Sequence, residues 1–406
     1  MIGLLALSLA TPLCAQGITS AALQGRVLQT DSAPIAGARV TATHAPSGTH
    51  WQVVTDAAGR YFMENVQVGG PYVLEAIALG FRPIRRTGIV LALGQRDRAD
   101  FVLEPAAVEL DALTVSASVD PLVNSGRTGP AHAVSATELG ALPNATRDLS
   151  VAAALSPLAA LRPLGGISIG GQNQGFNSFQ VDGGVNADLY LGRTPGGASP
   201  SGALPEVLPH AISLETVSEF QVLAAPFDVR LGGFAGGLLN AVTKSGTNDF
   251  HGSAFGFLQS GRVMAKNAAG NRSDFTTWQF GGTLSGPIAR NRMHFFLNAD
   301  LQQRVVPDAG FLIAADSGGA DLRKTGISFA SAERFRQLLD SFQLDPGSLG
   351  PSDGHLPAQD VFAKITMQLG TSGHVEVSHH YGHGDRREFI DTGRAANIYA
   401  LSSVAG

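Results

Sequence analysis

Three histidines and an aspartate near the end of the sequence are the side chains most able to bind a metal ion. They form the run His379-His380-x-x-His383-x-Asp385, and imidazole and carboxylate groups are ligands that Zn²⁺ takes in proteins. The flanking residues alternate between apolar and polar types, which predicts a β-strand. Because neighbouring side chains on a strand point to opposite faces, the pattern favours a plain strand over a metal site.

Asp56 and Gly59 form a second pattern with chemical potential, because an Asp-x-x-Gly run can offer oxygen ligands to a cation. The same run is typical of an Asx turn that ends in a left-handed glycine, and we expect the turn. The sequence offers no nucleophile beside a base and no pair of catalytic carboxylates. We therefore predict a protein that is not an enzyme and that requires no cofactor.

Composition narrows the classes of protein further. Only 15% of the 406 residues are charged and the net charge is -5, so no basic surface for nucleic acid is expected. Glycine is abundant at 50 residues, and phenylalanine at 21 far exceeds tryptophan at 2. This composition favours many strands and turns over long helices. A chain of this length predicts two or more domains.

Residues 1–15 are an apolar leader that ends in small residues at Ala15. The leader is too short to cross a bilayer, and we predict a signal peptide that is cleaved after Ala15. It has no positive n-region, so we expect the true start to lie upstream. Cys14 offers a lipoprotein alternative, but the bulky Leu13 before it fits that signal poorly. Cys14 is the single cysteine, so the exported product would contain no disulfide.

Short alternating stretches follow one another through residues 21–105, with turns about every ten residues. This rhythm predicts a β-sandwich. The expected strands are Leu23–Leu28, Ala38–Thr43, Trp51–Thr55, Arg60–Phe62 and Tyr72–Ala78.

The sequence of residues 119–248 predicts a small α+β domain with long loops that are rich in glycine and proline. Thr146 can cap a helix that runs through Val151–Leu155 and stops before Pro157. Loops of this length in a compact domain are either functional or disordered. Close approach of backbones in a tightly packed layer is expected at Gly232, Gly233, Gly236 and Gly237.

Residues 250–406 alternate in longer hairpins. Strands of about nine residues place apolar side chains such as Phe280 and Leu297 on one face and polar side chains such as Gln279 and Lys364 on the other. The strands of a soluble sandwich would also alternate between apolar and polar side chains. We therefore use the lengths of the connections to decide between a soluble sandwich and a membrane barrel. Tight turns over residues 286–292 and 371–373 contrast with a long excursion over residues 304–360, which contains one expected helix, Ala332–Phe342. Short turns on one side and long loops on the other are typical of an outer-membrane barrel.

Several motifs within residues 21–105 occur in a set order. Together they resemble the carboxypeptidase regulatory-like domain, a transthyretin-like sandwich. The resemblance implies a non-catalytic accessory or binding module, and no peptidase motif accompanies it. The motifs are Gly25-x-Val27, Pro34-x-x-Gly37-Ala38-x-Val40, Thr55-Asp56-x-x-Gly59-x-Tyr61, Tyr72 and Gly80-Phe81.

Three further phrases resemble the plug domain of the TonB-dependent outer-membrane transporters. The last phrase is similar to the Oar-like branch, in which a regulatory-like sandwich precedes the plug. The phrases are Gly170–Gly183, Ile212–Val222 and Gly233–Gly252.

The segment 109–117 joins the two regions, and its core is short, uncharged and extended by propensity. Taken alone it would be a plain linker, but a segment of this type can also add itself as a strand to an open sheet edge. Between these two neighbours it resembles the TonB box. The resemblance implies contact with TonB of the TonB–ExbB–ExbD complex through Leu113, Thr114, Val115, Ser116 and Ala117.

The resemblance implies a receptor in the cell outer membrane of a Gram-negative-type bacterium, with the sandwich in the periplasm and the barrel in contact with outer-membrane lipid. Such a receptor takes up a scarce extracellular solute, which for this chain could be an oligosaccharide, a peptide or a metal complex, by energy-coupled plug movement. Outward loops of a plug are plausible places for solute contacts. The candidates are Gln172, Asn173, Asn177 and Asp182.

The barrel predicted from this chain is incomplete. A plugged transporter barrel has about 22 strands, which at roughly ten residues each require some 220 residues, and fewer residues than that follow Phe250. We therefore expect a mainly β chain with an N-terminal β-sandwich, a small α+β plug and the first strands of an antiparallel transmembrane β-barrel. The last strand would have an unpaired edge.

Two other functions stay open from the sequence. One is a non-transporting cell-surface adhesin, or a structural protein whose sandwich and loops bind carbohydrate or peptide. The other is an accessory protein of a peptidase, which the first domain suggests. Deleting residues 113–117 separates transport from adhesion, because an adhesin would lose nothing.

Overall fold

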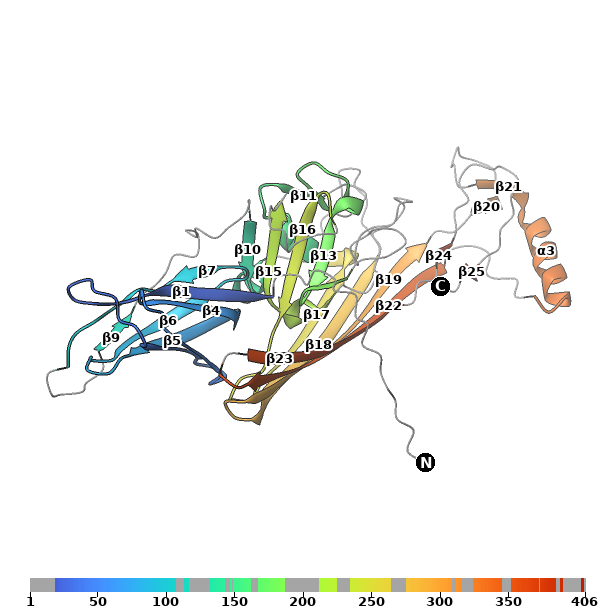
Figure 1. Ribbon diagram of the computed structural model, residues 1–406. Helices are drawn as coiled ribbons and strands as arrows, with labels where there is room; N and C mark the ends of the chain where they lie inside the picture. Colours follow the sequence, from blue (N-terminus) through green and yellow to red (C-terminus); the bar gives the residue numbers. More distant parts are fainter. Residues whose placement is uncertain are drawn as a thin grey trace, which may run out of the picture.

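The computed structural model consists of a β-sandwich, a plug sheet and a sheet of barrel strands (Figure 1). The predicted signal peptide, residues 1–15, and the predicted helix cap Thr146 lie outside the described residues. Within the described part of the chain, no helix has the length and apolar character needed to span a membrane. The structure describes residues 19–106, 113–116, 131–142, 147, 149–161, 167–186, 212–224, 234–263, 275–308, 312–314, 324–344, 352–371, 373–384, 388–389 and 403–404.

The sandwich is built from two sheets, as the alternation of the sequence predicts. Its strands are β1 (Ser20–Gln29), β2 (Arg39–His44), β3 (His50–Val54), β4 (Arg60–Gln67), β5 (Gly69–Ile77), β6 (Ile84–Leu91), β7 (Arg96–Arg98), β8 (Phe101–Leu103) and β9 (Leu113–Ser116). One sheet has the order β4-β1-β7 with β8 also paired to β1, and the other has the order β3-β2-β5-β6-β9. Tyr72, Leu74 and Phe101 are fully buried in the core between the sheets.

The Asp56 turn takes the geometry that the sequence predicts. Asp56 Oδ1 accepts hydrogen bonds from the backbone N–H groups of Ala58 at 2.9 Å and Arg60 at 2.8 Å, and Gly59 has φ +69°. The backbone N–H of Arg60 is the main cause that lowers the pKa of this carboxyl. The Asp-x-x-Gly run thus shapes a hairpin turn.

The plug is a five-stranded sheet with small helices beside it. Its elements are β10 (Ala131–Ser135), α1 (Ala136–Ala141), α2 (Leu149–Ala153), β11 (Ala159–Leu161), β12 (Ile167–Ile169), β13 (Ser178–Val181), β14 (Gly184–Val185), β15 (Val217–Ala224) and β16 (Gly237–Thr243), with 3-10 turns at Gln174–Phe176 and Leu214–Thr216. The sheet order is β10-β15-β16-β13-β14, and β11 pairs separately with β12. Every residue of the central strand β16 is buried.

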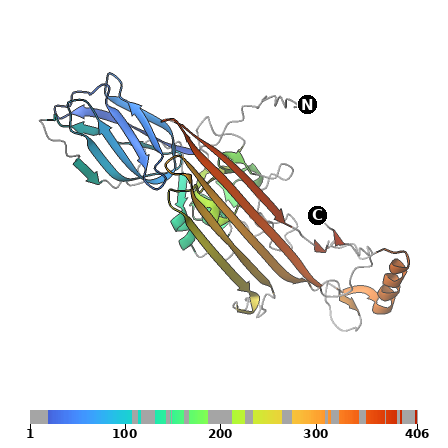
Figure 2. The same cartoon turned by 90° about the horizontal axis from the view of Figure 1, so that it is seen from below.

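Five antiparallel strands form the barrel sheet, with the order β17-β18-β19-β22-β23 (Figure 2). Their bounds are β17 (His251–Ser260), β18 (Thr276–Ala289), β19 (Met293–Asp308), β22 (Ser352–Leu369) and β23 (Gly373–Gly384), and a 3-10 turn covers Gly261–Val263. Among the described strands, β17 and β23 each keep one edge without a partner. An open edge after the last of these strands agrees with the incomplete barrel that the sequence predicts.

The barrel strands are longer than the nine residues that the sequence predicts. β19 has 16 residues and β22 has 18, and their register runs without a break from Met293↔Met367 to Asp308↔Ser352. The prediction ended where the alternation of side chains faded, but backbone pairing continues beyond that point. Likewise, β18 continues through Pro287, where the register shifts, because a bulge tolerates the missing N–H of proline.

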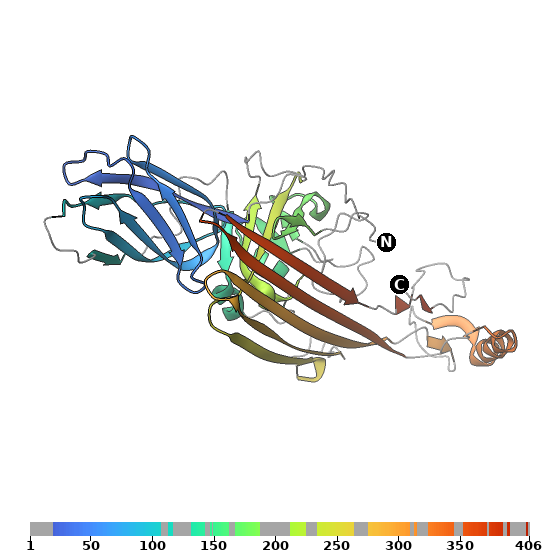
Figure 3. The same cartoon turned by 60° about the horizontal axis from the view of Figure 1, so that its bottom comes forward.

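The two faces of the barrel sheet differ as the sequence predicts. Phe280, Leu297 and Ile365 are exposed on the face away from the plug. The plug lies against the opposite face (Figure 3). That face carries buried polar side chains. These are Gln279, Ser285, His294, Asn298, Asp300, Asp360, Lys364, Thr366 and Gln368.

Smaller elements lie at the end of the barrel strands away from the sandwich (Figure 1). They are β20 (Leu312–Ala314), β21 (Lys324–Ser328), α3 (Phe329–Ser341), β24 (Glu388–Phe389) and β25 (Ser403–Val404). The helix α3 lies in the excursion between β19 and β22, close to its expected place. The tight turns lie at the sandwich end, so short and long connections fall on opposite sides.

Candidate functional site

The predicted TonB-box residues form β9, the last strand of a sandwich sheet. β9 runs parallel to β6, with Leu113 beside Ile84 and Ser116 beside Thr87. Ala117 lies outside the described residues. The segment is extended, as its composition predicts, and it pairs within its own chain.

Three of the four predicted solute contacts lie in the loop between β12 and β13. Gln172 and Asn173 are exposed. Asn177 is 7% exposed, and its amide is fully engaged: Nδ2 donates to the Ile167 carbonyl at 2.8 Å, and Oδ1 accepts from the Gly237 N–H at 3.0 Å. Asn173 Oδ1 also accepts a hydrogen bond from the Gly175 N–H at 3.0 Å, so Asn173 and Asn177 both shape the loop. Their solute contacts stay a prediction.

Glycines allow this loop to pack closely against the start of β16, although the atoms nearest to them belong to side chains and not to the backbone that the sequence predicts. A Cβ on Gly236 would lie 2.5 Å from Asn177 Oδ1, and a Cβ on Gly237 would lie 2.5 Å from Ile169 Cγ2. Both distances are far below van der Waals contact. Gly232 and Gly233 lie outside the described residues.

Asp182, the fourth predicted contact, lies at the other end of β13, in the turn to β14. Its Oδ1 accepts a hydrogen bond from the Thr243 N–H at 2.9 Å, and its Oδ2 accepts one from the Thr243 hydroxyl at 2.6 Å. The structure therefore does not bring Asp182 together with Gln172 and Asn173. It places Asp182 against the barrel wall.

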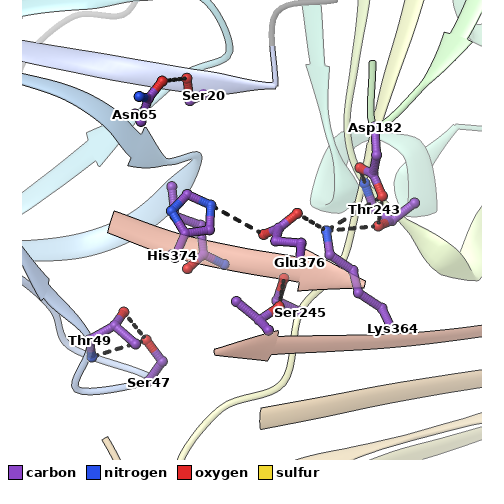
Figure 4. A network of polar contacts seen from close by, with 12 residues as sticks. Ser20, Ser47, Thr49, Asn65, Asp182, Thr243, Ser245, Lys364, His374 and Glu376 are labelled. Atoms are coloured by element: carbon purple, nitrogen blue, oxygen red, sulfur yellow. Dashed lines mark hydrogen bonds and ion pairs between the residues drawn. The ribbon is translucent and has the colours of Figure 1, made fainter. Parts of the chain in front are cut away.

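Lys364 is the barrel residue that meets Asp182 (Figure 4). Its side chain is 1% exposed. Lys364 Nζ lies 2.8 Å from Glu376 Oε2, 3.1 Å from the Thr243 hydroxyl and 3.5 Å from Asp182 Oδ2. An ammonium group has three hydrogens to donate, so these acceptors can satisfy it. One buried cation thus joins the plug to two neighbouring barrel strands.

The same network continues toward the sandwich. Glu376 Oε1 lies 3.6 Å from His374 Nε2 (Figure 4). The His374 ring meets the Trp51 ring edge-on, with centroids 6.0 Å apart. Trp51 belongs to β3, so polar and ring contacts connect all three parts of the chain.

Hydrogen bonds to the backbone of β3 hold the sandwich against the end of β22 and the turn that follows it. The His50 N–H donates to Gln368 Oε1 at 3.0 Å, and Gln368 Nε2 donates to the His50 carbonyl. The Gln52 N–H donates to the Thr371 carbonyl at 2.8 Å. Because β3 is the outer strand of its sheet, these bonds satisfy groups that would otherwise be unpaired.

The sandwich also contacts the plug through the loop that follows β6. The Leu93 N–H donates to Glu219 Oε1 at 3.0 Å, and the Leu93 carbonyl accepts from Gln221 Nε2 at 3.3 Å. The Leu93 side chain packs with Val68 and Val242 in a small apolar cluster. The plug strand β15 is therefore held directly by the sandwich.

His44 is buried where the sandwich meets the barrel residue His294. Its Nδ1 is 2.7 Å from the Ser47 hydroxyl. Burial, and to a smaller extent the nearby His294, lowers the pKa of His44 to about 4. The folded chain therefore holds this imidazole neutral.

Only some of these contacts have a signal in the sequence. Lys364 was predicted on the polar face of its strand, and a lone lysine among neutral residues could have marked a buried ion pair. Leu93 has no such signal, because its partners are more than a hundred residues away in the chain. The capping box of α1, in which Ser135 and Glu138 exchange hydrogen bonds, was readable as Ser-x-x-Glu and was missed.

The histidine run on β23 does not gather into a cluster. His380 Nε2 lies 2.6 Å from Asp360 Oδ2, and Asp385 lies outside the described residues. In the part of the chain that the structure describes, no three His, Cys, Asp or Glu side chains come together in a way that could hold a metal ion.

Known protein families match the sandwich and the first barrel strands. The carboxypeptidase regulatory-like domain matches residues 22–104, and the outer membrane beta barrel domain matches residues 242–314. Over 300 residues the chain is 29% identical to the TonB-dependent transporter Oar of Myxococcus xanthus. The chain is a relative of the TonB-dependent outer-membrane receptors. The match covers 68% of this chain and 26% of Oar, so the chain spans about a quarter of that receptor's length.

Solved outer-membrane receptors are similar at lower identity. The outer membrane transporter YddB of Escherichia coli is 12% identical with a TM-score of 0.45, over 66% of this chain and 35% of that one. The siderophore receptor PirA of Acinetobacter baumannii is 16% identical with a TM-score of 0.40, over 64% of this chain and 32% of that one. The barrel-domain match and the similarity to Oar place this chain in the outer membrane of a Gram-negative-type bacterium.

Proposed function

We propose that the chain is part of a receptor that takes up a scarce solute across the outer membrane by TonB-driven movement of its plug. The observation that carries this proposal is the seat of the plug sheet on the polar face of the barrel strands. Phe296 and Phe362 of the barrel wall belong to the same buried cluster as Phe220 and Leu239 of the plug. The plug core is thus completed by the barrel.

This seat combines a small apolar contact with polar contacts that can be exchanged for water. The buried side chains on the barrel face are mostly polar, and Lys364 bonds to both barrel and plug. A plug held in this way is a low-stability element that can shift without unfolding the barrel. No hydrolytic or redox step is required, so the receptor acts without being an enzyme.

Energy for the movement would come from the inner-membrane TonB–ExbB–ExbD complex. TonB would pair with residues 113–117 as an added strand and pull on the plug. A solute on the outer side would favour release of the segment on the inner side, which is a coupling between two sites. In this proposal the sandwich spans residues 21–105 and lies in the periplasm, the plug spans 119–248, and the first barrel strands lie within 250–406.

Solute would meet the plug at the loop that carries Gln172 and Asn173. Both side chains are exposed, and their loop lies at the end of β13 away from the sandwich. Oligosaccharides, peptides and metal complexes remain candidate solutes. Transport requires residues 113–117, the coupling segment, whereas simple adhesion does not.

The test uses the full-length receptor in cells. Residues 113–117 are replaced by Gly-Ser-Gly-Ser-Gly, which keeps the linker length, and the matched control carries the same replacement at residues 119–123. Labelled oligosaccharides, peptides and ferric chelates are offered in turn, and the probe that binds is followed into the cell. We expect the first variant to bind the probe and to lose uptake, while the control keeps both. Unchanged uptake in the first variant would support an adhesin and overturn the proposal.

A further inference from the structure

The outer edge of β6 already holds a strand, and that strand is the predicted coupling segment. The register pairs residues 84–87 of β6 with residues 113–116 of β9 in parallel. Without β9, β6 would be the last strand of its sheet and its outer backbone groups would be unpaired. Such edges accept extended segments readily.

The charged side chains of β6 leave this edge open. Arg85 turns to Glu75, with Nη2 to Oε1 at 3.1 Å. Arg86 donates to the Asp100 carbonyl at 2.5 Å and lies over the Phe101 ring, with its Cζ 5.1 Å from the centroid. Charges that often protect a sheet edge are thus engaged within the sandwich. The edge backbone stays accessible to a strand.

The segment is tied close to this edge. β8 ends at Leu103 and β9 begins at Leu113, so a short connection holds the segment near β6 at high effective concentration. The pairing covers only four residue pairs, and each backbone hydrogen bond contributes modestly to stability in water. Pairing of this kind between β9 and β6 is specific and reversible.

We propose that the sandwich stores the coupling segment as an edge strand along β6, and that TonB takes the segment from this edge by strand exchange. This inference rests on the proposed function and assigns a role to the N-terminal domain. The stored strand pairs with the beginning of β6, at residues 84–87, whereas Leu93, which bonds to Glu219 and Gln221 of β15, follows the other end of β6. The strand β6 therefore connects the stored segment to the part of the sandwich that touches the plug.

Disulfide trapping in the full-length receptor tests the register. Arg85 and Thr114 are partners, and Cα atoms of paired strands lie about 4.8 Å apart, within the range that a disulfide bridges. The test variant is Arg85→Cys with Thr114→Cys, in a Cys14→Ala background. The matched control is Arg85→Cys with Leu113→Cys, which joins positions on opposite faces of the sheet. Both variants are first checked for normal amounts in the outer membrane.

We expect a disulfide in the test variant and little or none in the control. Adding the purified periplasmic domain of TonB before oxidation should lower the trapped fraction at least several-fold. Equal trapping in both variants would overturn the storage. Trapping that persists while the TonB domain is bound would overturn the exchange, because TonB would then bind the segment without removing it from β6.

The two proposals fail in different ways. If replacing residues 113–117 abolishes uptake but the cysteines do not trap, uptake stands and storage is wrong. If the cysteines trap but the replacement leaves uptake unchanged, the segment is stored on β6 for a reason unrelated to transport.

Discussion

Lys364 is a charged side chain buried between two parts of the chain, and its three acceptors explain why that burial is tolerated. Glu376 comes from the barrel, and Asp182 and Thr243 come from the plug. A buried pair of this kind contributes little compared with an apolar contact of the same volume, but losing one partner leaves the other charge uncompensated. The ion pair therefore fixes where the plug sits more than it stabilises the whole receptor.

Lys364→Met keeps the apolar stem and removes the ammonium group. Asp182 and Glu376 are 15% and 25% exposed, so water can reach them in part. We therefore expect the variant to lose about 3 kcal/mol, the lower end of the range for a broken buried pair. Urea unfolding of the full-length receptor in detergent measures the loss. Arg85→Met is the matched control, because it breaks an exposed pair that is worth at most about 1 kcal/mol. Equal losses in the two variants would contradict the role of Lys364.

The lowered pKa of His44 predicts that the stability of the sandwich depends on pH. Its pKa of about 4 in the folded chain lies below the ordinary value of 6.5, so folding favours the neutral ring. This contribution is complete above pH 6.5 and is lost as the pH falls toward 4, by about 3 kcal/mol at most. His44→Gln can still bond to Ser47 and does not titrate. Thermal unfolding at pH 7 and pH 4 should show a larger loss in the natural receptor than in the variant, and parallel losses would contradict the prediction.

At the scale of elements, the sequence predicted those strands in which side-chain alternation and backbone pairing coincide. β2 and β3 lie within one residue of their expected places, whereas β5 begins three residues before its expected start. β6 was missed because Gly88, with φ +82°, and a register shift against β5 break its alternation. β10 was missed because it is short and pairs with β15, which is distant in sequence. β14 was missed because it has only two residues.

The candidate site was predicted only in part, for a similar physical reason. Residues 113–116 were expected to be extended because their types favour a strand, but no local pattern shows that β6 is their partner. Asp182 was placed with the solute contacts because a turn after a strand can face outward. Its true surroundings depend on Thr243 and Lys364, which reach it through sheet pairing and through the barrel wall. Contacts between distant segments are set by topology, which alternation alone does not determine.

At the scale of the whole molecule, the sandwich is attached to both the barrel and the plug. His50 and Gln52 bond to the barrel turn, and Leu93 bonds to the plug strand β15. In the proposed function, a force applied at residues 113–116 would pass through β6 to Leu93 and then to the plug. The first attachment would hold the sandwich in place, whereas the second would carry the force.

Leu93→Asp tests that path. Leu93 is 2% exposed, and a carboxylate there would be buried beside Val68 and Val242 and close to Glu219, at a cost of about 3 kcal/mol or more. We expect the contact between sandwich and plug to open while the barrel attachment holds. Uptake should then fall to the level of the variant without residues 113–117, with binding of the outer probe and trapping of residue 114 on residue 85 unchanged.

Leu79→Asp is the matched control, because Leu79 is fully exposed at 101% and the same change there removes no contact. Uptake in Leu93→Asp cells is compared with uptake in Leu79→Asp cells at equal receptor amounts in the outer membrane. Equal uptake would mean that force reaches the plug without passing through Leu93, by way of the chain that connects the segment to β10. A loss confined to Leu93→Asp would make the sandwich a working part of the coupling, since the segment, the barrel and the solute loop are intact in both variants.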